Sequence, residues 1–262
     1  MTIQRQYPAG TWTPSPGAAS PAQRIRVQAL SDVRSTLRNG EQLLLTLVIP
    51  LVLLVGLSLF DVVPTEPGQS AIEVVAPSII ALAVMSTAFT SLAIATGFDR
   101  RSGALKLLGT TPLTRGQLVT ARALGVLAIE AVQIVLIVLV AVALGWRPVG
   151  NPAAAVVLVI LGTLAFATWG VSLAGVLRAE ATLAVANGIY LLLMLGGGVV
   201  IPQSSYPPAM ATFVSLLPSG ALAGGLREAL SSGGGWPVAA MAVLVAWGAV
   251  GYLVAARTFR WD

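Results

Sequence analysis

One acidic and one amide side chain stand well inside a long, mainly apolar run of this sequence. Glu130 lies within the stretch from about 118 to 144, and Gln133 follows about one helical turn later. A charged carboxylate at the centre of a membrane costs about 2.5–3.5 kcal/mol, so such a residue normally faces a protein interior or a water-filled cavity. Glu130 and Gln133 are therefore candidates for a substrate path or a subunit interface. Equally open is a carboxyl group that a neighbouring helix satisfies without touching any substrate.

Other reactive chemistry is scarce in the chain. It contains no Cys and no His, which removes disulfides, thiolates and the commonest metal ligand, and excludes zinc sites and Ser-His catalysis in their usual forms. No Gly-x-x-x-x-Gly-Lys-Ser/Thr phosphate-binding loop occurs either. We therefore expect no catalytic residue, no metal site and no resident cofactor, and we expect that the chain is not an enzyme.

The elements that would hold these residues are membrane-spanning helices. Hydrophobic residues make up 56% of the 262 and charged residues 10%, against about 25% charged in an average soluble domain. About 20 helical residues cross the hydrocarbon of a bilayer. Six apolar runs of that order cover about 43–60, 76–97, 118–144, 153–177, 181–201 and 237–256. The predicted fold class is an all-α integral membrane protein with six transmembrane helices and no removable signal peptide.

Positive charge decides the predicted orientation, because cytoplasmic loops are enriched in Lys and Arg. Only Arg147 and Arg227 would lie on the outer side, where the first loop instead carries Asp61, Glu66 and Glu73. The basic residues that flank the spans on the other side are Arg24, Arg26, Arg34, Arg38, Arg100, Arg101, Lys106, Arg115, Arg122, Arg178, Arg257 and Arg260. Both termini are therefore predicted in the cytoplasm. The net charge of +5 is read as a topology signal rather than a nucleic-acid surface.

The chain before the first span divides into a tail and a helix. Residues 1–22 are rich in Pro, Gly, Ala, Ser and Thr, which predicts a flexible cytoplasmic tail ahead of a membrane domain over 23–262. From 24 to 39 the apolar residues share one helical arc, formed by Ile25, Ala29, Leu30, Val33 and Leu37. This pattern predicts an amphipathic helix on the cytoplasmic surface, in contact with membrane lipids. A plain extension of the first span is the alternative.

The loop between the second and third runs is the most informative polar stretch. It predicts a short apolar helix with Ser102 as its N-cap, Gly109 at its end and Pro112 preventing continuation. Thr114 and Gln117 then form a capping box that starts a new helix running into the third span. Leucines with basic neighbours at the cytoplasmic face suit docking into a groove of another protein. An ordinary positively charged loop would explain the charges but not the leucines.

Short elements of this loop carry a family resemblance: Gly103-Ala104-Leu105, Leu107-Leu108, Thr111-Pro112-Leu113 and Thr114. With them the loop resembles the cytoplasmic loop of permease subunits in type 2 ABC exporters, in particular a drug-resistance-like bacterial group. The span layout and the stretch Leu226-Arg227-Glu228-Ala229-Leu230 are also similar to that family. Arg100, Arg101 and Lys106 depart from it, because the family often carries acidic residues there. The charge pattern that faces the partner is therefore expected to differ.

The resemblance implies a permease whose motor is a separate ABC ATPase dimer, which would bind ATP and Mg. The implied ATPase-docking residues are Arg100, Arg101, Gly103, Leu105, Lys106, Leu107, Leu108, Thr111, Pro112 and Leu113. A second permease, identical or homologous, is also implied, with export from the cytoplasm across a bacterial cell (inner) membrane. The implied substrate is amphiphilic: a drug, a lipid or a polysaccharide. No nucleic-acid partner is expected.

The segment 202–236, between the fifth and sixth spans, is predicted to lie outside. Its two weakly apolar pieces, 210–217 and 221–230, are too short to span and suit re-entrant or interfacial helices. A surface loop is the alternative. Just before them, Gly196-Gly197-Gly198 would allow close helix packing or local unwinding.

Ion-coupled secondary transport is the main alternative function. That class often shows inverted repeats and several intramembrane ionisable residues. Here Glu130 is the one acidic residue clearly within a predicted span, and the sequence has no convincing repeat. An intramembrane protease is less favoured still, because no Asp pair lies within the spans.

Overall fold

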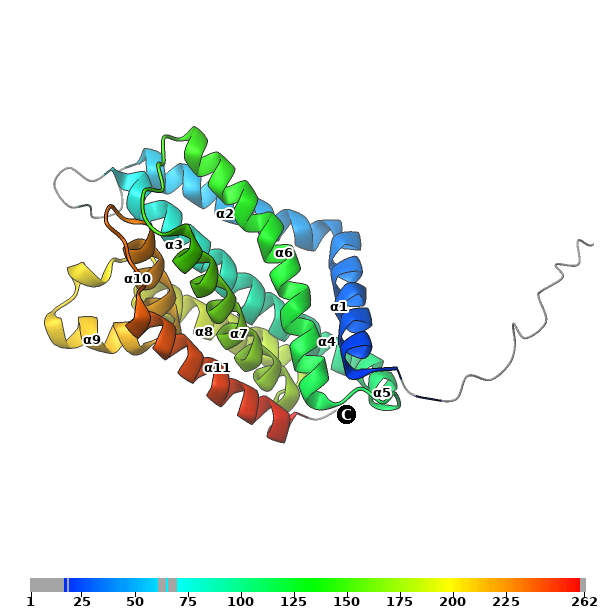
Figure 1. Cartoon of the computed structure of the whole chain (residues 1–262). Coiled ribbons are helices and arrows are strands. Elements are labelled where there is room, and N and C mark those ends of the chain that lie inside the picture. The colour runs from blue at the N-terminus through cyan, green and yellow to red at the C-terminus, as the bar shows by residue number, and fades with distance from the viewer. Residues whose placement is uncertain (1–16, 18, 61–64, 66–69, 260–262) are drawn as a thin grey trace, which may run out of the picture.

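The computed structural model describes residues 17, 19–60, 65 and 70–259. This part of the chain folds into helices joined by short connections, without a strand (Figure 1). Most of the predicted tail lies outside the described residues, as do Asp61, Glu66 and Arg260.

Five helical segments of the described chain are long and apolar enough to cross a membrane. The first, Ala71–Arg101, consists of α3 (Ala71–Val84), the π-helical η1 (Met85–Ser91) and α4 (Leu92–Arg101). The others are α6 (Arg115–Ala143), α7 (Pro152–Val176), α8 (Ala179–Gly196) and α11 (Val238–Thr258). These segments correspond to the second to sixth predicted spans. In place of the first predicted span lies α2 (Gly40–Leu59), whose apolar stretch Thr46–Leu59 is shorter.

The helix of the fifth predicted span ends earlier than expected. α8 stops at Gly196, whereas the sequence predicted helix as far as 201. Gly198 adopts φ +78°, a left-handed conformation that suits glycine, and a Cβ on Gly197 would lie 2.2 Å from Ser219 Oγ. The three glycines therefore end α8 and let the chain pass close to Ser219. This is the local unwinding that the sequence allowed.

α7 is the central helix of the bundle. It packs against α11 and α10 (Pro218–Leu230), and also against α4, η1 and α6. Small residues make this possible, because backbones approach closely where side chains are missing. A Cβ on Gly170 would lie 2.9 Å from the carbonyl oxygen of Phe89, and one on Gly162 would lie 2.9 Å from Leu222.

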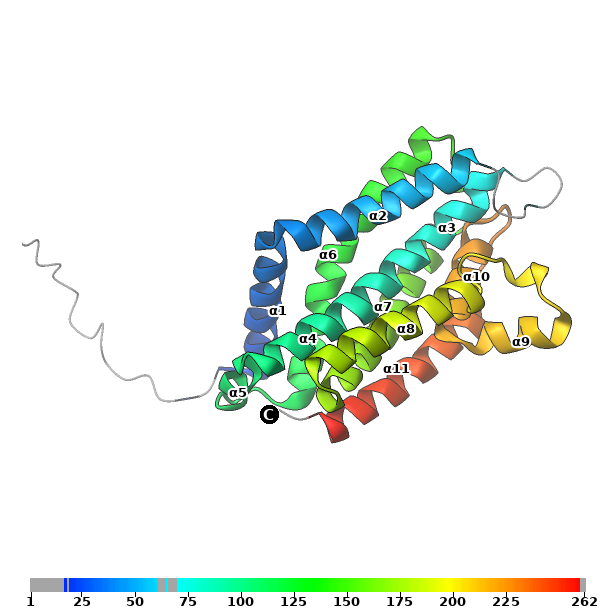
Figure 2. The same cartoon turned by 180° about the vertical axis from the view of Figure 1, so that it is seen from behind.

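The two ends of the bundle differ in their short helices (Figures 1 and 2). At one end, here named the α5 end, lie α5 (Ala104–Gly109), the start of α6 and the end of α11. At the other, the α10 end, lie α10 and α9 (Pro208–Leu216), which are bent by 100° relative to each other. The break falls at Leu217. Residues 218–220, where the sequence predicted the break, form the first turn of α10 instead, because proline is accepted at the first position of a helix.

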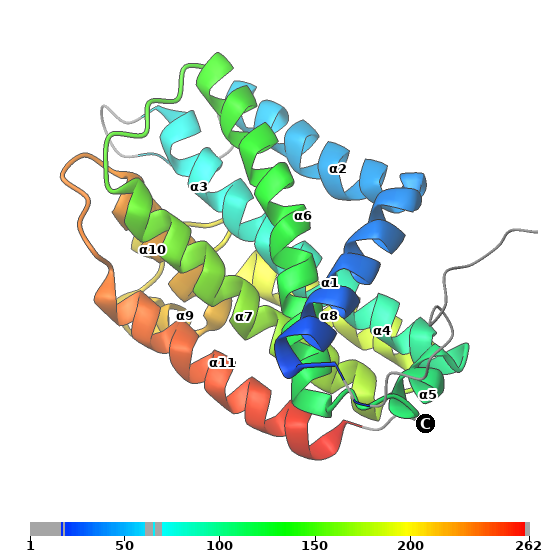
Figure 3. The same ribbon diagram turned by 45° about the vertical axis from the view of Figure 1, so that its right-hand side comes forward.

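α1 (Pro21–Arg38) is a separate helix rather than a continuation of α2, because the chain turns at Asn39 between them. It lies across the first half of α6 (Figure 3), where a Cβ on Gly125 would be 3.3 Å from Asp32 Cβ. Of the predicted apolar arc, Ile25, Ala29 and Val33 are half-buried, while Leu30 and Leu37 are exposed. Part of the apolar arc therefore covers α6, instead of facing only the membrane as predicted.

Candidate functional site

The predicted docking helix exists as α5, held between α4 and α6 by two tight connections. Gly103 adopts φ +81° ahead of α5, a conformation that glycine reaches without strain. After α5, Thr114 Oγ1 accepts from the backbone N–H of Gln117 at 3.3 Å, and Gln117 Oε1 accepts from the backbone N–H of Thr114 at 3.2 Å. The predicted capping box is confirmed, and it starts α6 where expected.

The predicted ends of α5 were wrong in detail. Ser102 does not cap the helix: its hydroxyl donates to the Asp99 carbonyl at 3.0 Å, and Gly103 occupies the N-cap position. Gly109 is the last helical residue rather than a left-handed one beyond the end. The hydroxyls of Thr110 and Thr111 satisfy the free carbonyls instead, at 2.7 and 2.6 Å from the oxygens of Leu107 and Leu108.

The leucines of this loop have opposite environments. Leu105 is fully buried and Leu113 nearly so, which anchors the loop to the bundle. Leu107 is 72% exposed, although it lies on a short helix outside the segments long enough to cross a membrane. Lys106, Thr111 and Pro112 are exposed near it. We name Lys106, Leu107, Thr111 and Pro112 the docking ridge.

Two predicted docking residues contact the bundle itself. Arg100 Nη1 donates to the carbonyl oxygen of Ala174, near the end of α7, at 3.0 Å. Arg101 forms an ion pair with Glu180 in the first turn of α8. These contacts fix the end of α4 relative to α7 and α8. Both arginine side chains therefore have partners within this chain.

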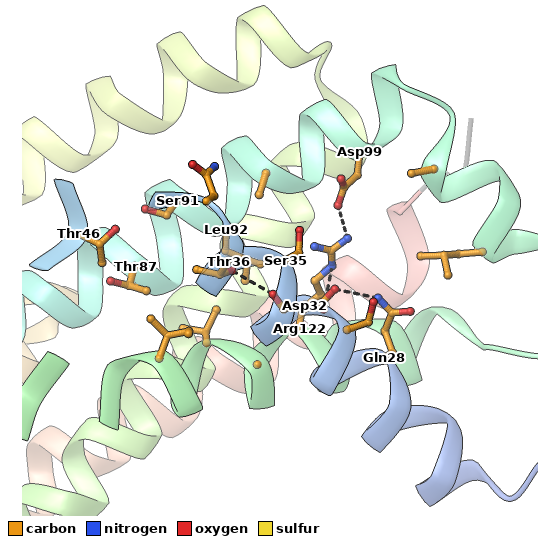
Figure 4. Close-up of a pocket in the computed structure, with 18 of the residues that line it drawn as sticks. Gln28, Asp32, Ser35, Thr36, Thr46, Thr87, Ser91, Leu92, Asp99 and Arg122 are labelled. Atoms are coloured by element: carbon orange, nitrogen blue, oxygen red, sulfur yellow. Dashed lines mark hydrogen bonds and ion pairs between the residues drawn. The ribbon is translucent and has the colours of Figure 1, made fainter. Parts of the chain in front are cut away.

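An ion cluster centred on the buried Arg122 lies at the α5 end, and sequence reasoning missed it (Figure 4). Arg122 on α6 is 7% exposed, donates to the Asp99 carboxylate of α4 and lies 3.6 Å from Asp32 of α1. Gln28 donates to the other oxygen of Asp32 at 2.8 Å. Burial raises the pKa of the Asp32 carboxyl, and the Arg122 guanidinium opposes that shift. One arginine thus ties three helices together at the α5 end.

Replacing this arginine should loosen that connection. We expect Arg122→Met to lower the free energy of unfolding by about 2 kcal/mol, less than a fully buried pair would lose, because Asp99 is partly exposed. Denaturant titration of the purified protein in detergent measures the change. Arg115→Met, at the exposed start of the same helix, is the matched control and should change the value by less than about 0.5 kcal/mol. Equal losses in the two variants would contradict a structural role for Arg122.

Glu130 and Gln133 lie in the interior of the bundle. Glu130 is 1% exposed, and the hydroxyl of Thr163 on α7 donates to its Oε2, while Oε1 is buried without a hydrogen-bond partner. Gln133 connects two other elements: its Oε1 accepts from Thr87 of η1 at 3.1 Å, and its Nε2 donates to the Thr46 carbonyl of α2 at 2.7 Å. Both side chains thus join helices of this one chain.

A second arginine, which is half-buried, organises the α10 end. Arg227 of α10 donates to Ser78 Oγ of α3 at 2.8 Å and to the Gly198 carbonyl at 2.9 Å, and it also reaches the Val199 carbonyl. The unwound stretch after α8 exposes these carbonyls, and the guanidinium satisfies them. The sequence pattern marked Arg227 as part of a family element but not as the residue that holds α10 in place.

These features define a class: a helical membrane protein with a short helix in a basic loop at one end of the bundle and a sharply bent helix pair at the other. The family described as ABC-2 family transporter protein matches residues 55–257. The chain belongs to this family of type 2 ABC permeases, which implies a membrane location, a transport role without catalysis and an ATPase partner. It is also 25% identical over 219 residues to the Bacillus subtilis (strain 168) protein "Putative transport permease YvfS", a match that covers 80% of this chain and 86% of that protein.

Proposed function

We propose that this chain is the permease subunit of an ATP-driven exporter that moves an amphiphilic substrate out of a bacterial cytoplasm. Its six spans would be α2, the segment α3–η1–α4, and helices α6, α7, α8 and α11. Two such permeases, identical or homologous, would form the translocation path. A separate ATPase dimer would bind ATP and Mg and dock at the α5 end.

The observation that carries this proposal is the docking ridge. Leu107 is an exposed apolar residue that the bundle does not use, whereas Leu105 on the same short helix is fully buried and fixes its position. A rigid helix with an apolar residue pointing outward suits a groove on a partner protein. A flexible loop could not transmit a displacement from such a partner to the spans.

The distribution of basic residues supports a cytoplasmic α5 end. Arg100, Arg101, Lys106 and Arg115 flank the connections at this end, whereas Arg147 and Arg227 belong to the other end. Positive residues favour the cytoplasmic side of a membrane. The same end holds the start of α1 and the end of α11, so with this orientation both termini of the helical domain would lie in the cytoplasm.

Motion of the ATPase dimer would reach the spans through the ends of α4 and α6. Only two residues, Ser102 and Gly103, separate α5 from α4, and the capping box fixes the start of α6 after α5. Arg122 adds α1 to the same unit. A push on the docking ridge would therefore tilt α1, α4 and α6 together and change which side of the membrane the path faces.

The proposal is tested by isolating the complex. The tagged permease is purified with any ATPase subunit that stays bound to it and reconstituted in vesicles, and ATP-dependent movement of an amphiphilic dye is measured. We expect a complex whose ATP hydrolysis drives dye away from its cytoplasmic side. Dye movement driven by a proton or sodium gradient, with no ATPase bound, would support ion-coupled transport instead.

Glu130→Gln should affect transport more than assembly. The amide keeps an oxygen that can accept from Thr163 but cannot ionise, so the α6–α7 contact survives while the buried carboxyl group is lost. We expect at least about a tenfold fall in transport rate with normal recovery of the ATPase complex. Glu228→Gln, an exposed change of the same kind on α10, is the matched control. Unchanged export in Glu130→Gln would remove Glu130 from the substrate path.

A further inference from the structure

A cavity of about 560 Å³ lies at the α5 end between α1, α4 and α6 (Figure 4). It reaches from Leu107 and Thr111 of the docking ridge to Thr87, whose hydroxyl donates to Gln133 in the middle of α6. The cavity therefore connects the cytoplasmic end of the bundle with its interior. Its volume falls within the range of about 300–1,000 Å³ found for small-molecule sites.

The lining of this cavity is amphipathic. Its neutral polar side chains come mainly from α1 and η1, among them Gln28, Ser35 and Ser91. Helices α4 and α6 contribute apolar side chains, among them Leu92 and Ile129, and charged ones as well. A ligand with one polar and one apolar end would satisfy this mixed lining.

The charged side chains that line the cavity determine whether a bound ligand would carry a positive or a negative charge at its polar end. Its ionisable side chains are Asp32, Asp99 and Arg122, so two carboxylates face one guanidinium. The guanidinium is already committed to both carboxylates, as its contacts show. An anion entering here would meet the Asp99 carboxylate, which is partly exposed, and would have no free cation to pair with.

We propose that this cavity is the cytoplasmic entry site for small cationic amphiphiles. The proposal rests on the proposed function, since it names the substrate class of that exporter. The positive group lies near Asp99 and Asp32, and the apolar body lies against Leu92 and Ile129. From there the path continues past Thr87 towards Gln133.

The first test compares two dyes of similar size and opposite charge. The intact permease–ATPase complex is placed in phosphatidylcholine nanodiscs, and binding of cationic rhodamine 6G and anionic fluorescein is followed by fluorescence anisotropy. We expect rhodamine 6G to bind at least about tenfold more tightly. Equal binding, or preference for fluorescein, would overturn the proposal.

A charge-addition variant locates the binding site. Ser35→Lys adds a positive charge to the wall of the cavity without changing the ion cluster, and should weaken rhodamine 6G binding about tenfold. Ser204→Lys adds the same charge at an exposed position at the α10 end, and should leave both binding and basal ATP hydrolysis unchanged. Equal loss in both variants would contradict binding in this cavity. If Ser35→Lys does not fold, the dye comparison in the unmodified complex still tests whether the cavity prefers cationic amphiphiles.

Failure of this inference is distinguishable from failure of the proposed function. A complex that assembles and exports fluorescein with ATP hydrolysis would retain the exporter and refute the cationic cavity. A chain that recruits no ATPase would refute the exporter itself.

Discussion

Leu107→Asp is expected to abolish ATPase binding while leaving the helix bundle intact. The side chain is 72% exposed, so the change should alter the free energy of unfolding by less than about 0.5 kcal/mol. In a docked complex the same residue would be buried, and a carboxylate there would lose apolar contact and its own hydration. A central apolar anchor is worth about 2 kcal/mol or more, so we expect affinity to fall at least about 30-fold and transport to stop. Co-purification and thermal unfolding measure the two effects.

Two further variants separate docking from folding. Leu107→Met keeps an apolar side chain of similar volume, so ATPase binding should be retained. Leu105→Asp places a carboxylate at a fully buried position of the same helix and should reduce the yield of folded permease. If the Leu107→Asp permease still co-purifies with the ATPase at normal stoichiometry, the docking ridge is not the contact surface.

Arg227→Leu is expected to produce the largest loss of stability. The change removes the donor that serves Ser78 Oγ and the carbonyls of Gly198 and Val199, and leucine offers them nothing in return. Charged hydrogen bonds contribute about 1.5–3 kcal/mol each, so after partial relaxation we expect the free energy of unfolding to fall by about 3–5 kcal/mol. Denaturant titration in detergent micelles measures the fall.

The control for this variant lies at the same end of the bundle. Arg147→Leu removes an exposed arginine from the turn between α6 and α7 and should change stability by less than about 0.5 kcal/mol. A similar loss in both variants would mean that net positive charge at this end matters, and that the contacts of Arg227 do not.

Local patterns were predictable because local forces create them. The capping box of Thr114 and Gln117 depends on residues three apart, and the break before Pro218 depends on one ring that cannot continue a helix. Apolar length located five of the six predicted spans, since crossing a bilayer requires that length in any fold. Each of these features can be predicted without knowing which distant segments are in contact.

The candidate site was less predictable because it is assembled from distant segments. Asp32, Asp99 and Arg122 lie on three helices, and nothing in the spacing of the sequence marks them as partners. Leu105 and Leu107 are chemically identical and two residues apart, yet packing buries one and exposes the other. Serine is a favoured N-cap residue, so Ser102 was the predicted cap. The left-handed turn at Gly103 instead lets the Ser102 hydroxyl donate to the Asp99 carbonyl.

The π-helical η1 sets the rotational phase of the helix that carries Asp99. Helical phase advances by about 100° per residue, so each surplus residue in a wide turn rotates everything after it by that angle. A continuous α-helix over Ala71–Arg101 would therefore turn Asp99 away from Arg122 while leaving α3 where it is. The wide turn thus lets one long helical segment pack against α10 at the α10 end and direct Asp99 towards Arg122 of α6 at the α5 end.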